Sequence, residues 1–146
     1  MSASVSESAT EVTAAVVTGV NGNIVSIDVA EGSLVKNEVA YVCVGDERLK
    51  SEVLRIHGRS AALQVFEDTL GVRVGDRVEL THRLLSASLG PGLLGAVYDG
   101  LQNPLEALAA RDGFFLRRGN YVDALDTEHN WSFVPQCRTG DRLKAG

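Results

Sequence analysis

The fold is indicated most clearly by residues 39–66, VAYVCVGDERLKSEVLRIHGRSAALQVF. This stretch holds three runs rich in β-branched and other apolar residues, at Val39 to Val44, Leu49 to Ile56 and Ala61 to Phe66. Turns with glycine separate the runs, one at Gly45-Asp46 and one at Gly58. Short strands at this regular spacing are typical of an antiparallel sandwich or a small closed barrel, and not of alternating βαβ units.

The same rhythm continues on both sides of this stretch. Upstream, Val12 to Thr18 and Asn23 to Val29 flank a cluster of Gly and Asn. This spacing predicts a hairpin, because Asn-Gly supplies the positive φ of a tight turn. Downstream, Val72 to Val74 leads through a Gly75-Asp76 turn to a run at Val78 to Leu80. The alternation in the second run does not show which of its faces points inward.

Closing the sheet removes exposed edge strands. The sequence therefore predicts a mainly β fold, with a small closed antiparallel barrel over residues 11–82 after a disordered lead-in at residues 1–10. The length of 146 residues suits one domain with a sizeable core. Hydrophobic residues make up 45% and charged residues 23%, as in ordinary globular proteins.

The net charge of -5 gives no source for the phosphate attraction that nucleic-acid binders use, and it disfavours contact with an anionic membrane. The sequence has no apolar run of about 18 residues, the length that a transmembrane helix needs. The N-terminus, MSASVSESATE, lacks the basic and apolar regions of a secretory signal. We therefore expect a cytoplasmic chain.

Neither the cysteines nor the histidines indicate a metal site. Cys43 and Cys137 lie far apart, in strand-like contexts, which favours buried free thiols over a disulfide or a metal pair. His57, His82 and His129 have no ligand spacing to one another or to the cysteines. The sequence predicts no metal-ligating residues.

A different pattern begins at Arg83. Leu84 to Leu89 suggests one more strand. A helix of a few turns is predicted next, because apolar residues recur at helical spacing between Pro91 and Gly100, at Leu93, Leu94, Val97, Tyr98 and Leu101. Asn103-Pro104 interrupts this helix, and a further helical turn at Leu105 to Ala110 follows.

The segment GPGLLG, Gly90 to Gly95, satisfies the G-x-G-x-x-G dinucleotide pattern, with Asp112 at about the expected distance of 20 residues. That pattern works within a βαβ unit, whereas short antiparallel strands precede this one. Pro91 also removes an N–H that would face the pyrophosphate. A turn at a helix start, which lets neighbouring backbones pack closely, is the favoured interpretation, and a dehydrogenase is the weaker alternative.

No other motif forms a catalytic or cofactor site. A phosphate-binding loop needs Gly-Lys, but the lysines follow Val35, Leu49 and Leu143. The acidic loop at Asp123, Asp126 and Glu128 lacks calcium-loop spacing and is interpreted as a solvated turn. Arg117-Arg118 is interpreted as a surface pair rather than an anion site. Catalytic, cofactor-binding and metal residues are therefore all predicted to be absent.

A longer segment, SLGPGLLGAVYDGLQNPLEAL at Ser88 to Leu108, resembles the connection between the N-terminal barrel and the nucleotide-binding domain in rotary ATPase head subunits, specifically the catalytic A subunit of the vacuolar and archaeal type. Residues 19–42 resemble the opening barrel strands and residues 47–86 the later ones. The order of Arg118-Gly119, Ala124-Leu-Asp126 and Trp131-Ser-Phe-Val-Pro135 resembles the start of the bulge insertion of the A subunit. The first turn, GVNGN, lacks the family's usual Gly-Pro.

The resemblance implies a six-stranded N-terminal barrel, a connector with its helix at residues 83–110, and the truncated start of a β-rich bulge region at residues 111–146. It implies assembly within an alternating A3B3 head, where the barrel edges pair with neighbouring B subunits. The parent would be a proton- or sodium-translocating ATP synthase or ATPase, peripheral on the cytoplasmic side of the membrane. Its ATP or ADP and Mg site would lie after Gly146, so this chain alone is expected to be inactive.

Two further expectations remain. The alternative to an assembly role is a freestanding small barrel that binds a ligand or an oligonucleotide, which the net charge and the scarcity of aromatic residues disfavour. The apolar face of the predicted helix at Leu93 to Leu101 would be partly uncovered in this chain. Such a patch predicts self-association.

Overall fold

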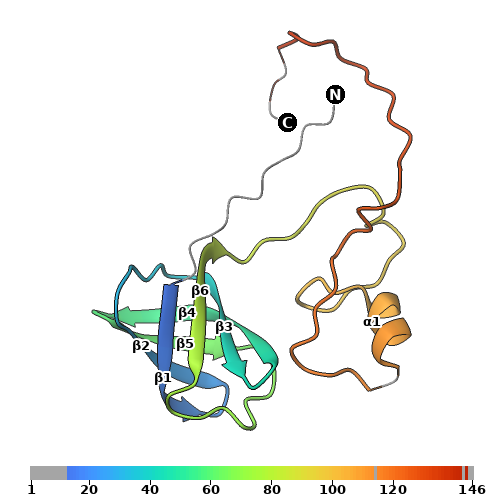
Figure 1. The fold of residues 1–146 in the computed structure, drawn as a ribbon. Helices are drawn as coiled ribbons and strands as arrows, with labels where there is room; N and C mark the ends of the chain where they lie inside the picture. The colour runs from blue at the N-terminus through green and yellow to red at the C-terminus, as the bar shows by residue number, and fades with distance from the viewer. Residues whose placement is uncertain (1–12, 114, 143, 145–146) are drawn as a thin grey trace.

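A computed structural model describes residues 13–113, 115–142 and 144 of the chain. Six antiparallel strands form a closed barrel, with the order β1-β2-β5-β4-β3-β6 around the ring (Figure 1). Their bounds are β1 Thr13–Asn21, β2 Ile24–Val29, β3 Glu38–Val44, β4 Glu47–His57, β5 Ser60–Val65 and β6 Arg77–Leu84. The predicted barrel fold is confirmed, but the expected pairing of barrel edges with a neighbour is wrong, because β1 pairs with β2 and β6 and leaves no free edge in the ring.

The barrel interior is filled by the alternating side chains that the strand pattern implies. On β2, Val25, Ile27 and Val29 point inward and are almost fully buried, which resolves the inward face. The core cluster also holds Ala15, Val17, Ala40, Val42, Leu49, Val53, Ala61, Leu63, Val65, Val78 and Leu80. Aliphatic residues of moderate size thus pack a narrow barrel without any buried aromatic ring among the core residues described.

A β-bulge on β4 changes which side chains reach the outer surface. Val53 pairs with Leu63 on the inner face, but the next paired residue is Arg55, which stands opposite Ala62. The extra residue, Leu54, breaks the strict alternation, so that Arg55 is exposed while Ile56 packs against the core. Without the bulge, Arg55 would point into the apolar interior.

One carboxylate is buried at the end of the barrel where β6 finishes. Glu38 is fully buried, and its oxygens accept hydrogen bonds from the backbone N–H groups of Val35, at 2.7 Å, and His82, at 3.0 Å. The His82 ring Nδ1 lies 3.3 Å from the same carboxylate. His82 has a φ of 54°, a left-handed conformation that is uncommon outside glycine. Glu38 thereby ties the start of β3 to the strained exit of β6.

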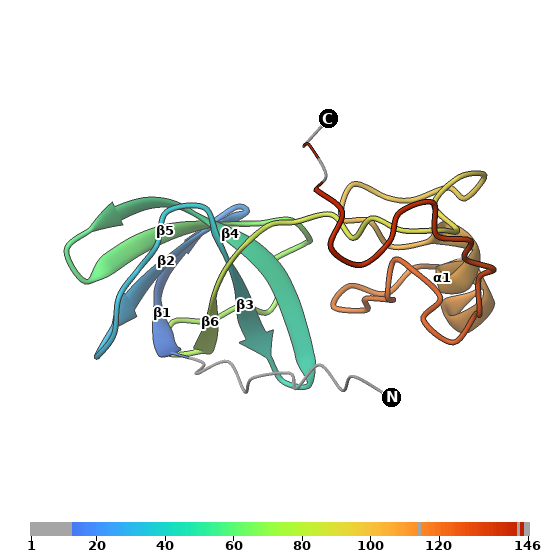
Figure 2. The same ribbon diagram turned by 90° about the horizontal axis from the view of Figure 1, so that it is seen from above.

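After Leu84 the chain leaves the barrel and forms a second lobe beside it, which Figure 2 shows from above. The lobe contains one helix, α1, at Leu105–Asp112. The predicted helix at Leu93 to Leu101 is wrong, because Gly92 and Gly95 adopt φ values of 94° and 89° and turns occupy this segment. Pro104 stands directly before α1 in an extended conformation, so the helix begins after it.

Three other local predictions are also corrected. Leu84 to Leu89 is not a separate strand: β6 ends at Leu84, and Leu89 is 82% exposed. Val72 to Val74 lies in a turn region rather than in a strand. In the described residues from 115 to 142, turns, bends and irregular backbone replace the expected β-rich structure, and Arg142 does not lie in a strand. The predicted lead-in at residues 1–10, and Leu143 of the predicted strand start, lie outside the described residues.

Candidate functional site: the junction between barrel and lobe

The lobe contacts the barrel through a short segment, Arg118 to Tyr121, which we call the clasp. It lies against the start of β4 and against the loop that joins β5 to β6, residues 66–76. These partners lie about 50 to 71 positions away in the sequence, so the contacts are tertiary rather than local. The clasp therefore determines how the lobe is placed on the barrel.

Arg118 is the ionic anchor of the clasp. Its guanidinium donates from Nε to the Glu47 carboxylate at 2.8 Å, and Nη2 lies 2.7 Å from the same oxygen. The remaining amino group, Nη1, donates to the backbone carbonyls of Asp68, at 2.9 Å, and Leu70. A planar guanidinium presents donors on three nitrogens and reaches a carboxylate and two carbonyls at once, whereas a lysine has all its donors on one nitrogen. The interpretation of Arg117-Arg118 as a surface pair is wrong for Arg118, whereas Arg117 is exposed.

The Glu67 carboxylate holds the rest of the clasp. One oxygen accepts the backbone N–H of Gly119 at 2.9 Å, and the other accepts the Tyr121 hydroxyl at 2.6 Å. The same hydroxyl accepts the backbone N–H of Lys50 at 2.7 Å. Burial, followed by the hydrogen bond to the Glu67 carboxylate, raises the pKa of Tyr121 far above its ordinary value. The phenol therefore stays protonated and serves as both donor and acceptor.

Position 119 requires glycine because the backbone there lies very close to β4. Its φ is 72°, and a Cβ placed on it would lie 3.2 Å from the backbone nitrogen of Arg48 and 3.3 Å from the Cβ of Glu47. A larger residue would face both backbone strain and a backbone that has little room to move. The Arg118-Gly119 pair of the resemblance thus has a structural role here, with a cation that anchors and a glycine that permits contact.

Aromatic and cationic groups cover the clasp from the β3 and β4 side. The Tyr121 ring meets the Tyr41 ring edge-on, with centroids 6.1 Å apart. The Arg48 guanidinium lies 4.3 Å from the centroid of Tyr41, within cation–π range. Arg48 also pairs with Glu79 of β6 at 2.7 Å. The junction therefore links β3, β4 and β6 with the lobe through one continuous set of contacts.

Hydrogen bonds rather than a large core hold the lobe together. The Asp99 carboxylate accepts from the backbone N–H groups of Leu101 and Asn103 and from the Asn103 side chain, at 2.8 to 2.9 Å. Burial alone would raise the pKa of Asp99, but these hydrogen bonds hold it below its ordinary value. Asn103 also accepts from the backbone of Val122, next to the clasp. Leu108 is the buried hydrophobic residue among the described residues of the lobe.

The GPGLLG segment has a packing role. A Cβ on Gly90 would lie 2.9 Å from the Leu125 side chain, and one on Gly92 would lie 3.1 Å from the Trp131 ring. The prediction of a helix start with closely packed backbones is wrong, because turns occupy this segment and side chains make the close approach. No helix follows the glycines directly in this described segment and the preceding strands are antiparallel, so the structure contradicts the dinucleotide alternative.

The other candidate groups do not converge on a catalytic or metal site. Within the described ranges, no group of three or more His, Cys, Asp or Glu side chains is placed to hold a metal ion. Asp126 accepts the backbone N–H groups of Glu128 and His129, which is the geometry of a local turn. Cys43 is half-buried, and burial raises the pKa of its thiol. The prediction that both thiols are buried is wrong for Cys137, which is exposed.

A pocket of about 420 Å³ lies next to the clasp, with Glu67, Leu108, Leu116, Arg117 and Asn120 among its lining residues. It combines two carboxylates, Glu67 and Asp99, and the exposed Arg117 guanidinium with mostly apolar walls. The clasp already uses Glu67, and hydrogen bonds from Asn103 occupy Asp99, so the pocket presents no free acid–base pair. The geometry of the pocket is that of a packing gap between lobe and barrel rather than of a catalytic site.

The residues that form the barrel define the class of protein. Residues 17–82, from β1 to β6, match the model of the β-barrel domain of the ATP synthase alpha/beta family. The barrel therefore belongs to the β-barrel domains of the ATP synthase alpha/beta family. Within the part of the chain that the structure describes, no helix is both long and apolar enough to cross a bilayer.

Individual relatives narrow the class. The chain is 56% identical over 134 residues to V-type ATP synthase alpha chain 1 of Treponema pallidum (strain Nichols), covering 92% of this chain and 23% of that protein. It is 57% identical over 128 residues to the V-type ATP synthase alpha chain of Treponema denticola, covering 88% and 22%. The alpha chain of Borreliella afzelii is 52% identical over 130 residues, covering 89% and 22%. The chain thus spans about a quarter of the length of the curated relatives it matches.

The clasp was missed by residue patterns alone. Arg118, Gly119 and Tyr121 have no motif spacing to Glu47 or Glu67, and no periodicity connects them. The signal that did mark part of the clasp was the resemblance, which included Arg118-Gly119. The chemistry of that pair became visible once the fold brought it to β4.

Proposed function

We propose that this chain forms the N-terminal part of the alpha chain, the A subunit, of a V-type ATP synthase, and that its own task is assembly. The observation that carries the proposal is the closed six-stranded barrel, whose residues match the family model. Over about 130 residues, the chain is also more than 50% identical to V-type ATP synthase alpha chains. The whole protein would couple ATP synthesis or hydrolysis to proton or sodium transport, at the cytoplasmic face of a membrane.

The nucleotide and Mg of such an enzyme do not fit the residues of this chain. A phosphate-binding loop needs a lysine directly after glycine, and Lys36, Lys50 and Lys144 follow other residues. The described residues also place no three acidic or histidine side chains where they could hold a metal ion. No catalytic step is assigned to these residues. We propose that the chain comprises a barrel at residues 11–82, a connector at residues 83–110 and the start of the bulge region at residues 111–146.

Contact with neighbouring subunits would use the outer face of the barrel. Because the sheet is closed, a partner cannot add a strand, and contact must come from outward side chains. β1 offers two exposed valines on this face, Val16 at 47% and Val20 at 40%. We propose that they lie within the contact with an adjacent B subunit of the head.

The clasp supports the same role in a different way. A hydrogen-bonded junction fixes the lobe relative to the barrel at several points, through Arg118, Gly119 and Tyr121. The lobe and the barrel would then move together as one rigid unit, as they would not if a flexible linker joined them. Such rigidity suits a connector between an assembly domain and the rest of the protein.

The proposal is tested by assembly with the beta chain of the same V-type ATP synthase. Sedimentation of the mixed pure proteins should show a complex. A Val16→Asp, Val20→Asp double variant should weaken it, whereas Val97→Asp, at a 62% exposed valine of the lobe, serves as the matched control. Absence of any complex, or equal loss in the control, would contradict the proposed contact. ATP turnover by the pure chain would contradict the assembly role itself.

Exposed apolar side chains of the lobe predict self-association of the isolated chain, which is a second test. Leu94 is 98% exposed, Phe115 88% and Phe133 84%. The helix face predicted at Leu93 to Leu101 does not exist, but single-chain exposure of this kind still favours association with another surface. Within the proposed full-length protein these residues would be covered by the remaining polypeptide. The isolated chain is expected to self-associate, and a strict monomer at high concentration would argue against such covering.

A further inference from the structure

The β4 bulge shapes a shallow basic groove on the outside of the barrel, away from the clasp. The groove has a volume of about 330 Å³ and is lined by Lys36, Leu54, Arg55, Ile56 and His57. The bulge at Leu54 turns Arg55 outward next to it, so an aliphatic side chain and a cation lie side by side. The backbone N–H of Asn37 donates to the Val53 carbonyl at 2.9 Å, which brings Lys36 to the same place.

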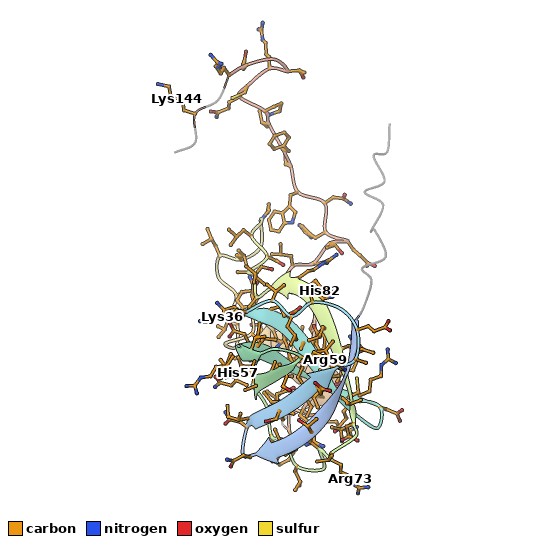
Figure 3. All side chains as sticks on the ribbon, turned by 90° about the vertical axis from the view of Figure 1, so that its left-hand side faces the viewer. Lys36, His57, Arg59, Arg73, His82 and Lys144 are labelled. Carbon is orange, nitrogen blue, oxygen red and sulfur yellow. The ribbon has the colours of Figure 1, made fainter. Side chains whose placement is uncertain are left out.

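No residue that the structure describes compensates the charges at this groove. Lys36, Arg55 and His57 are exposed, and no described residue makes an ion pair or hydrogen bond with their side chains. Glu52, the nearest carboxylate along β4, is not among the lining residues. On a chain whose net charge is -5, the two cations Lys36 and Arg55 at one groove are a local reversal of sign. In Figure 3, Lys36 and His57 project from the same side of the barrel.

The floor of the groove is aliphatic. Leu54 and Ile56 are both half-buried, and Ile56 also packs against the barrel core. A cationic rim around an aliphatic floor is complementary to a segment that carries carboxylates together with an aliphatic side chain. A single-stranded nucleic acid would instead need stacking platforms, and no Phe, Tyr or Trp ring lines the groove.

We propose that this groove docks an acidic peptide segment of a partner protein, with an aliphatic side chain seated between Leu54 and Ile56. Carboxylates of the segment would pair with Lys36 and Arg55, and the imidazole of His57 would border the same site. The inference does not depend on the proposed function, because it rests on the groove and its charges alone.

The test uses the full chain and three synthetic peptides of equal length, made of glutamate with leucine, glutamate with serine, and glutamine with leucine. NMR of the isotope-labelled chain should show shifts at Lys36 and Leu54 to His57 with the first peptide, and weaker or no shifts with the other two. The double charge reversal Lys36→Glu with Arg55→Glu should weaken binding of the first peptide by about tenfold or more.

Arg73→Glu is the matched control, since Arg73 is an exposed cation elsewhere on the barrel (Figure 3) and its reversal changes the charge in the same sense. It should leave affinity almost unchanged. Shifts located away from the groove, equal loss in the control, equal binding of the glutamine peptide, or no binding of the first peptide would each overturn the proposal. Stronger binding of oligothymidylate at the same residues would overturn it in favour of a nucleic-acid site.

Discussion

Replacing Tyr121 with phenylalanine is expected to loosen the clasp and lower the free energy of unfolding. The hydroxyl donates to Glu67 at 2.6 Å and accepts from the Lys50 backbone at 2.7 Å, and both bonds are lost together. The ring and its edge contact with Tyr41 remain. An unsatisfied buried donor costs about 1–3 kcal/mol, and because these groups are half-buried we expect a loss of about 2 kcal/mol.

Tyr98→Phe provides the matched control for this change. The Tyr98 hydroxyl donates one hydrogen bond, to the Ala124 carbonyl at 3.0 Å, so its loss should cost about 1 kcal/mol or less. Urea unfolding of the two variants and of the parent chain measures the difference, and amide exchange reports on the Lys50 N–H. If Tyr121→Phe costs no more than Tyr98→Phe, or if the Lys50 amide stays equally protected, the clasp does not have the strength inferred for it.

Alkaline pH should remove the stabilisation that the Tyr121 hydroxyl gives to the parent chain. Below the ordinary tyrosine pKa of 10.0, the phenol is protonated in both the folded and the unfolded state. Above pH 10.0 the unfolded chain releases this proton, whereas the raised pKa in the folded state retains it. Stability from this group therefore falls as pH rises above 10.0. The stability gap between the parent and Tyr121→Phe should narrow there, and a constant gap would contradict the buried phenol.

Three further changes test the barrel and its contact with the lobe. Glu38→Gln replaces one acceptor oxygen with a donor beside the N–H of His82 and should lower stability by about 1–3 kcal/mol, measured by urea unfolding. Gly119→Ala should destabilise more than Gly58→Ala in thermal unfolding, because both glycines have positive φ but a Cβ meets backbone at Gly119 alone of the two; equal effects would contradict the close approach. Leu49→Ala in the core should cost about 2–5 kcal/mol in the same urea assay, and a loss below that range would show that the site collapses around the cavity.

The barrel could be predicted from the sequence because the patterns that indicate its strands and turns are local. Alternating apolar residues and glycine turns place each strand within a few positions of its observed bounds, as at Asn23 to Val29 for the strand Ile24–Val29. The helix was misplaced for a reason that is also local. Leu93 to Leu101 has helical spacing, but Gly92 and Gly95 adopt positive φ, and the competing stretch after Pro104 has fewer glycines and forms α1 instead.

The clasp could not be predicted in the same way. Arg118 is indistinguishable from a surface cation until Glu47, 71 positions earlier, is brought beside it. The β4 bulge is likewise invisible in the pattern, since an uninterrupted alternation would have placed Arg55 inside the barrel. Both features depend on which strands become neighbours, and no local rule specifies this.

Strand periodicity, turn chemistry and composition were enough to establish a mainly β chain with a closed barrel, because each strand must bury one face and each turn needs its own backbone conformation. Tertiary structure alone determined that Arg118 and Tyr121 join lobe to barrel, and that Lys36 and Arg55 share one groove. The physical reason is that hydrogen bonds and ion pairs form only between groups that are close in space. Residues far apart in the sequence come that close only when the chain folds and the ring of strands closes.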